Sequence, residues 1–311
     1  MSPLLLRLIV LLIASAAPLF AATYEIVGHV PSSTTALAPT AGSKEAFIVA
    51  VGSGGKYDCG ELRMLQDRRT KHLLNFTGYN GKSPSALLNV RRNIYGITAE
   101  GGRNNEGTLF RLRGTRLQTL VQFDETTGAA KTLHAHGATL YGTCANGAFT
   151  LRRRNFQFFP LPLAADVAML NGQLYATRFY YNNLYQLTSS GSTTLQSDFP
   201  DSIIAGKKVI FATTSYGGLY REGSVRIYTP ATNSLRPLVA FQSYNGGNPN
   251  IFVALDNGKL FAGNAEGIWQ VGAHPKLLQS VQSLRFLNTD GRRLFGGAGY
   301  SLGIPVFVIT P

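Results

Sequence analysis

The sequence predicts an all-β protein, a single closed β-propeller of about seven four-stranded blades. Three observations predict this fold. A degenerate segment recurs about every 41 residues, tight-turn dipeptides stand just before several of its copies, and helical periodicity is absent throughout. A period near 41 residues is the length of one four-stranded blade, so each copy of the segment marks one blade.

The clearest copy of the repeat is IYGITAEGGRNNEGTLFRL at residues 94–112, and residues 47–65 and 210–228 resemble it most. In all three copies a Gly-Gly pair is followed, five residues after its second member, by another glycine. Four shorter copies lack part of this loop, at residues 140–151, 174–187, 260–271 and 294–309. The chain therefore contains seven units.

Turn chemistry predicts where the strands of each unit begin. Each unit has an apolar anchor at an equivalent position: Ile48, Tyr95, Tyr141, Tyr175, Phe211, Phe261 and Phe295. Asn171-Gly172, Asn257-Gly258 and Asp290-Gly291 stand just before three of these anchors. Such dipeptides accept the positive backbone angles of two-residue hairpins, so each anchor is predicted to open the second strand of a hairpin.

The two ends of the chain predict how the ring closes. The seventh unit ends at Ile309 with two residues left, so its outer strand is missing. Residues 23–30, TYEIVGHV, are a candidate for that strand. Pairing them with the strand that ends near Ile309 removes an exposed sheet edge. The first strand of unit one is expected within residues 33–43.

The N-terminal segment predicts export. Arg7 and an apolar run to Ile13 precede a stretch of small residues from 14 to 22, the three parts of a secretory signal peptide. We expect a signal peptide at 1–22, a propeller at 23–311 and a secreted, periplasmic or cell-surface location. An uncleaved anchor is the alternative. No later segment approaches the length of a membrane span.

The charge balance indicates the class of partner. The chain has 29 Lys and Arg against 16 Asp and Glu, a formal charge of +13. Such an excess concentrates anionic partners near the protein, and for an exported protein these are acidic polysaccharides or surface glycans. No nucleic-acid module is present, so nucleic acid is not an expected partner. The alternative is that the charge only favours solubility.

Cofactor and hydrolase chemistry find little support. The chain has no Gly-x-Ser-x-Gly, phosphate-loop or His-Glu-x-x-His motif, so no cofactor is expected. A zinc site that uses Cys144 or His134 stays open, although no ligand spacing favours it. Cys59 and Cys144 could pair in an oxidising compartment, but they fall in units one and three, which are not neighbours. A glycosidase would need two carboxylates that face each other. The candidate acidic residues are Glu100, Glu106, Glu222, Asp166, Asp198 and Asp201.

A second element repeats at residues 75–87 and 240–252, which share Phe, Tyr-Asn-Gly and Pro at the same offsets, with Tyr79 and Tyr244 as the tyrosines. Together with the Gly-Gly loops, this element resembles the GloVer repeat family of exported bacterial proteins. The resemblance covers most of residues 23–311. It implies export and a propeller and brings no assigned activity, since fold does not fix function.

Departures from the repeat point to a candidate site on the face with the Gly-Gly loops. His134 is expected in the middle of an innermost strand where other units have Leu88, Ala168, Ile204 and Ala254. Arg178 stands three residues after its anchor, where other units have Thr98, Cys144 and Thr214. Aromatic and basic residues of the same face complete the patch: Tyr180, Tyr181, Tyr216, Tyr220, Arg221, Tyr79 and Tyr244. Each of these residues also has a plain structural explanation, in packing or in bonds to backbone carbonyls.

This residue set suits β-elimination of a 4-linked uronate. Arg178 would bind the carboxylate, while His134, Tyr181 and Tyr216 would move protons. The layout resembles the ulvan lyases, seven-bladed propellers that use His, Tyr and Arg, although no local motif matches. The two functional hypotheses are therefore a non-enzymatic propeller that binds anionic glycan, which the sequence favours, and a polysaccharide lyase.

Overall fold

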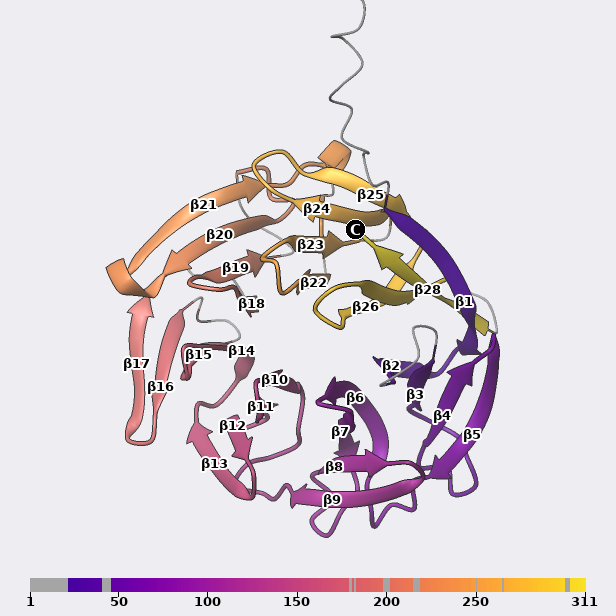
Figure 1. Cartoon of the computed structure of the whole chain (residues 1–311). Coiled ribbons are helices and arrows are strands. Elements are labelled where there is room, and N and C mark those ends of the chain that lie inside the picture. The colour runs from indigo at the N-terminus through magenta and orange to yellow at the C-terminus, as the bar shows by residue number, and fades with distance from the viewer. Residues whose placement is uncertain are drawn as a thin grey trace, which may run out of the picture.

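Seven antiparallel four-stranded sheets form a ring around a central channel (Figure 1). The structure is a computed structural model that describes residues 22–40, 46–178, 181, 183–197, 202–214, 219–245, 247–249, 251–264, 266–299 and 303–311. The prediction of a seven-bladed all-β propeller is confirmed. The expected signal peptide lies outside the described residues, apart from residue 22.

The strands of each blade follow one another from the channel outward, except in the last blade. Blade one contains β2 (Thr34–Pro39), β3 (Phe47–Val51), β4 (Glu61–Gln66) and β5 (Arg69–Asn75). Blade two contains β6 (Lys82–Val90), β7 (Asn93–Glu100), β8 (Thr108–Arg113) and β9 (Arg116–Gln122). Blade three contains β10 (His134–His136), β11 (Thr139–Cys144), β12 (Gly147–Arg152) and β13 (Asn155–Pro160).

The remaining blades repeat this order. Blade four contains β14 (Ala164–Leu170), β15 (Gln173–Arg178), β16 (Leu184–Thr188) and β17 (Gly191–Gln196). Blade five contains β18 (Ser202–Ala205), β19 (Ile210–Thr214), β20 (Ser224–Thr229) and β21 (Ser234–Ala240), with 3-10 turns at η1 (Pro230–Thr232) and η2 (Ser243–Asn245). Blade six contains β22 (Ile251–Ala254), β23 (Leu260–Gly263), β24 (Gly267–Val271) and β25 (Lys276–Ser280). Blade seven contains β26 (Leu284–Thr289), β27 (Leu294–Ala298), β28 (Gly303–Thr310) and β1 (Thr23–Pro31).

The N-terminal strand closes the ring as the sequence predicts. β1 pairs antiparallel with β28, from Thr23 opposite Thr310 to Pro31 opposite Gly303. Val27 and Val30 of β1 are buried in the cluster between blades seven and one. Tyr24 stacks on Phe307 at a centroid distance of 5.5 Å. Residues from the two ends of the chain therefore hold the same blade together.

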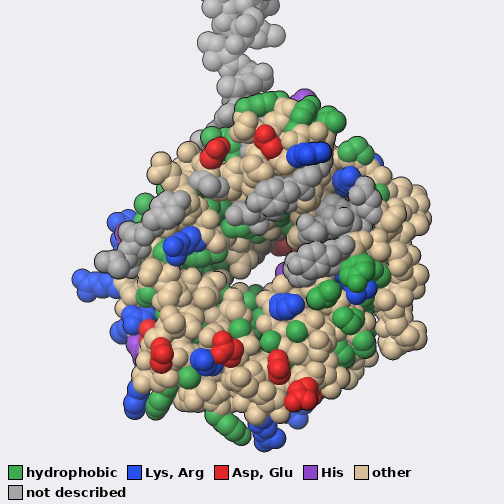
Figure 2. Space-filling view, turned by 180° about the vertical axis from the view of Figure 1, so that it is seen from behind, with side chains coloured by type: hydrophobic (Ala, Val, Ile, Leu, Met, Phe, Trp, Pro, Cys, Tyr) green, Lys and Arg blue, Asp and Glu red, His purple; other side chains and the backbone are tan. Residues whose placement is uncertain are grey.

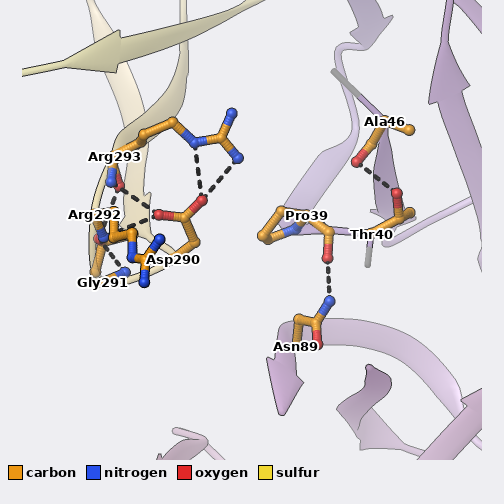
Figure 3. A network of polar contacts seen from close by, with 9 residues as sticks. Pro39, Thr40, Ala46, Asn89, Asp290, Gly291, Arg292 and Arg293 are labelled. Carbon is orange, nitrogen blue, oxygen red and sulfur yellow. Dashed lines mark hydrogen bonds and ion pairs between the residues drawn. The ribbon is translucent and has the colours of Figure 1, made fainter. Parts of the chain in front are cut away.

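The core lies between neighbouring sheets, because each blade buries one face against the next. Phe76 and Phe110 meet between blades one and two at 5.4 Å, and Phe123 packs on Phe149 between blades two and three at 5.3 Å. Polar bonds also cross between blades (Figure 3): Asn89 Nδ2 of β6 donates to the Pro39 carbonyl of β2 at 2.6 Å.

Antiparallel pairing divides the connections between two faces. Hairpin turns between the first and second strands and between the third and fourth strands form one face, which we call the turn face. Loops between the second and third strands, together with the connections between blades, form the other, which we call the loop face. Asn171 (φ 52°) and Gly172 (φ 78°) lie on the turn face with the backbone angles that the Asn-Gly signal predicts.

The Gly-Gly loops of blades one and two lie on the loop face, and the positive φ angles of their glycines favour glycine there. In blade two, Gly101, Gly102 and Gly107 have φ between 77° and 83°. A Cβ atom on Gly107 would overlap the carbonyl oxygen of Thr98, so no other residue fits there without moving the backbone. The repeated glycine pattern therefore indicates one loop conformation on the loop face.

Candidate functional site

His134 lies at the start of its strand, which corrects the expectation that it is in the middle. β10 contains only residues 134–136, and its ladder begins opposite Tyr141. The ladder starts this late because the backbone N–H of Thr143 donates to the Thr132 side-chain oxygen at 2.9 Å. The register also gives Val253, opposite Phe261, as the equivalent residue of blade six in place of Ala254.

The His134 ring faces blade four. It stacks on Tyr141 at a centroid distance of 5.4 Å, and its side chain is 40% exposed. Its Nε2 atom lies 3.6 Å from Oδ1 of Asp166. Burial raises the pKa of Tyr141 to about 12, against a backbone hydrogen bond from Met169 that lowers it. Tyr141 is therefore a neutral packing partner for the imidazole at physiological pH.

Asp166 is a site residue whose role the sequence did not reveal. It stands in the irregular part of β14 between Ala164 and Val167, and its side chain is 16% exposed. Its Oδ2 accepts hydrogen bonds from Ser202 Oγ at 2.6 Å and from the Ile203 backbone N–H at 3.2 Å. The only sequence signal was an acidic residue inside an otherwise apolar first strand.

Arg178 ends β15 with its guanidinium held on two sides. Its Nε donates to the Pro162 carbonyl at 2.9 Å, and its central carbon lies 4.1 Å from the Tyr181 ring centroid and 5.8 Å from that of Tyr185. Within the described part of the chain, its two terminal nitrogens have no acceptor. These two nitrogens can therefore bind a carboxylate.

The other predicted site residues are dispersed over the loop face. Tyr220 and Tyr244 help to line a groove of about 430 Å³ between blades five and six, together with His274 and Pro275 of the turn between β24 and β25. Tyr79 lies at the connection between blades one and two and is 67% exposed, and Tyr244 is 77% exposed. Arg221 stands beside Tyr220 with φ 60°. Tyr180 and Tyr216 lie outside the described residues.

The repeated Tyr-Asn-Gly turn is built to hold its tyrosine outward. In the first copy, Asn80 Oδ1 accepts the Thr77 backbone N–H at 2.8 Å, and Gly78 and Gly81 bond to each other across the turn. The backbone is fixed by these bonds without any contribution from the ring of Tyr79. An exposed ring on a rigid turn is therefore available for a partner.

Metal and membrane features give few further constraints. Among the described residues, no cluster of His, Cys, Asp or Glu could hold a metal ion. Cys59 and Cys144 are free thiols, and Cys144 is buried. Helical structure in the described part of the chain consists of short 3-10 turns, and no helix there could span a membrane.

Comparison with known proteins supports the fold alone. No family model matches the chain, and no curated protein matches it. Among solved structures, the chain is similar to the WD40 β-propeller domain of Doa1, with a TM-score of 0.64 at 8% identity over 91% of this chain and 96% of that one. YCF48 from Cyanidioschyzon merolae gives a TM-score of 0.59 at 13% identity, with 93% and 98% coverage.

A third neighbour is extracellular. It is the extracellular domain of a B. thetaiotaomicron protein described as a hybrid two-component system, with a TM-score of 0.61 at 17% identity over 91% of this chain. The present chain spans only 39% of that neighbour's length. These likenesses establish a seven-bladed propeller whose structural neighbours have varied functions. The resemblances to GloVer repeats and to ulvan lyases stay predictions.

Proposed function

We propose that this protein is an exported binding propeller that takes the uronate residues of an acidic polysaccharide on its loop face. One observation carries the proposal: Arg178 presents its two terminal nitrogens while its Nε and its ring-facing side are already engaged. A guanidinium fixed in this way loses little side-chain entropy when it binds a carboxylate. Carboxylate recognition is therefore favoured at this point of the face.

Exposed tyrosines extend the proposed site. Among the described residues, five large aromatic side chains are more than 45% exposed, and all stand on the loop face: Tyr57, Tyr79, Tyr181, Tyr220 and Tyr244. A tyrosine ring offers a flat apolar face and a polar tip, which suits the C–H face and the hydroxyl groups of a sugar ring. A glycan that lies across this face would thus meet one fixed cation and several aromatic contacts.

The experiment is a binding titration with a short galacturonate oligomer and with its neutral galactose counterpart. The parent protein should bind the acidic oligomer alone. Arg178→Lys keeps the charge but loses the planar fork, so it should weaken binding about fivefold to tenfold, and Arg178→Gln should weaken it further. Arg103→Gln, which removes one exposed cation of the same face, is the matched control and should change binding by less than about twofold.

Two results would overturn this proposal. Equal binding of the neutral and the acidic oligomers would show that the protein does not recognise the uronate carboxylate. Equal effects of the Arg178→Lys and Arg103→Gln variants would show that the planar guanidinium of Arg178 makes no specific contact with the oligomer.

A polysaccharide lyase is the second candidate function, and the orientation of His134 favours it. Oδ1 of Asp166, on the next blade, lies 3.6 Å from Nε2 of His134, a contact that places an acid beside the imidazole without a hydrogen bond between them. In β-elimination a base takes the C5 proton of the uronate, the C4–O bond breaks, a C4–C5 double bond forms and an acid protonates the leaving oxygen. Incubation with uronate polymers should then produce ultraviolet absorbance of the unsaturated product. If no polymer that the protein binds gives this absorbance, the lyase function is rejected and only the binding function remains.

A further inference from the structure

The exposed cations are concentrated on the face opposite the proposed glycan site. Nine arginines occupy the hairpin turns of blades one to three, and all nine are exposed: Arg68, Arg69, Arg91, Arg92, Arg113, Arg116, Arg152, Arg153 and Arg154. The described turns of these blades contain a single acid, Asp67. These nine residues, which we call the arginine cluster, lie on the turn face, whereas the sequence predicts anion contacts on the loop face.

The loop face of the same three blades has the opposite balance. Its described residues include six acids and four cations: Asp58, Glu61, Glu100, Glu106, Asp124 and Glu125 against Lys56, Lys82, Arg103 and Lys131. Figure 2 shows acidic side chains gathered on the face seen from behind Figure 1, over the blades at its lower edge. The positive charge is therefore segregated, and a field of one sign extends from the turn face.

Backbone conformation gives a second, independent observation. Arg91 and Arg92 form the first turn of blade two with φ of 50° and 67°, where blade four has Asn171 and Gly172 at 52° and 78°. Arg153 also has a positive φ, of 60°. A left-handed conformation costs a residue such as arginine about 1 kcal/mol, and Asn-Gly is the residue pair that this hairpin turn favours.

Arginine at these turns thus adopts a backbone conformation that it does not favour. A structural requirement would select Asn or Gly, as in the sibling turn of blade four. Backbone strain that persists at an exposed turn points to a functional use of the side chain.

The arginines of the cluster keep their charge available. None of the nine forms an ion pair with an acid of the described residues. Among the nine, only Arg113 donates a side-chain hydrogen bond within the described residues, from its Nε to Asn93 Oδ1 at 3.1 Å. The turn of blade seven shows the contrast (Figure 3): there, Arg293 is bonded to Asp290 at 2.7 Å. Unpaired arginines on neighbouring turns repel one another, and a polyanion would remove that repulsion.

We propose that the turn face of blades one to three is a second binding surface, for a linear acidic polysaccharide held by its charge. Guanidinium groups match the carboxylate and sulfate groups of such a chain. No large apolar side chain is exposed in the described turns of these blades, which disfavours insertion into a lipid surface. The described residues of this surface also include no helix or aromatic platform for reading nucleic-acid bases. It is independent of Arg178, so the protein can hold one polymer on each face.

The test replaces the strained arginines by the residues of the sibling turn. Arg91→Asn/Arg92→Gly removes two charges and restores the Asn-Gly turn, so the melting temperature should stay equal or rise. Affinity for heparin, used as the sulfated polyanion, should fall about tenfold at 0.15 M salt, with a shallower salt dependence, since each contact releases about 0.7–0.9 counterion. Lys56→Gln/Arg103→Gln removes two exposed cations of the loop face and should change heparin affinity less than about twofold.

The outcomes separate this surface from the proposed function. Arg178→Lys should leave heparin binding unchanged, and the turn variant should leave binding of the short galacturonate oligomer unchanged. Equal heparin affinity in the turn variant and the parent, or an equal loss in the loop-face control, would overturn the proposal. The parent could instead bind duplex DNA or anionic lipid vesicles more tightly than heparin and lose that binding in the turn variant. This result would show that the partner is not a polysaccharide.

Discussion

Nε2 of His134 and Oδ1 of Asp166 lie 3.6 Å apart across the boundary between blades three and four. The other oxygen of Asp166 accepts the Ser202 hydroxyl of blade five at 2.6 Å, so one carboxylate contacts the first strands of three blades. The acid stands between the serine and the histidine here, whereas a hydrolytic triad has its histidine between the other two. The contacts thus favour an orienting and structural role for Asp166 over serine hydrolysis.

Asp166→Ala should destabilise the fold by about 2–4 kcal/mol, because it leaves Ser202 Oγ and the Ile203 and Val167 backbone N–H groups without their carboxylate acceptor. Denaturant unfolding monitored by circular dichroism measures this loss. Glu125→Ala, at an exposed acid in the connection between blades two and three, is the control and should change stability by less than about 0.5 kcal/mol. Equal stability of the two variants would contradict the role of Asp166.

The repeat made the fold predictable from the sequence. Seven anchors, tight-turn dipeptides and a missing last strand are local signals, and they gave the number of blades and the closing partner, residues 23–30. Local signals suffice because each blade is one supersecondary unit that packs only on its neighbours. The start of β10 was misplaced because a threonine side chain replaces a ladder hydrogen bond there, which no periodicity reveals.

The site was less predictable, because its contacts join different blades. Arg178 and Tyr181 are three residues apart in the sequence, and the guanidinium carbon of Arg178 lies 4.1 Å from the Tyr181 ring centroid. The contact of His134 with Asp166 depends on an irregular stretch of β14, which turns an otherwise inconspicuous acid toward blade three. The arginine cluster could not be predicted for a different reason: Arg91-Arg92 is not a turn signal, so the sequence does not assign these charges to a face of the ring.

Deletion of residues 23–31 should prevent the chain from folding cooperatively, because β28 would lose its outer partner and expose a sheet edge. A milder change, Val27→Ala, removes two methyl groups from the cluster between blades seven and one and should cost about 1–2 kcal/mol. Urea unfolding of both proteins measures these effects. A deletion variant that unfolds with the cooperativity of the parent would show that β1 is dispensable.

The two cysteines should differ in reactivity. Burial raises the pKa of the Cys144 thiol to about 12, although backbone hydrogen bonds from Asn146 and Gly147 lower it. Its thiolate is therefore scarce at pH 8, whereas the thiol of Cys59 is partly exposed. Labelling of the native protein with a thiol reagent should modify one cysteine quickly, and labelling in denaturant should modify both. No labelling even in denaturant would indicate a disulfide.

Asp290 should make stability depend on pH in the acid range. Its partial burial would raise its pKa, but hydrogen bonds from the backbone and side chain of Arg293 and from the Arg292 backbone outweigh this and hold the pKa below the ordinary value. A lowered pKa stabilises the folded state above the unfolded-state pKa of about 4, and this contribution is lost as the pH falls through the folded-state pKa.

At pH 7 the Asp290→Asn variant should therefore melt at a lower temperature than the parent, because its free energy of unfolding is lower by about 1 kcal/mol. The difference between the two proteins should shrink below pH 4. Melting curves between pH 2 and pH 7 test this. A difference that is constant over the whole range would mean that the Asp290 charge is not responsible.

Tyr181 should separate binding from catalysis on the loop face. Tyr181→Phe keeps the ring under the Arg178 guanidinium, at 4.1 Å in the parent, so affinity for the galacturonate oligomer should change less than about twofold. Tyr181→Ala removes the ring and should weaken binding about threefold to tenfold, the range of a partly exposed cation–π contact. If the parent also yields unsaturated product, Tyr181→Phe should abolish that product while it still binds, because only the hydroxyl that transfers the proton is lost. Equal binding by the Phe and Ala variants would show that the ring does not position Arg178.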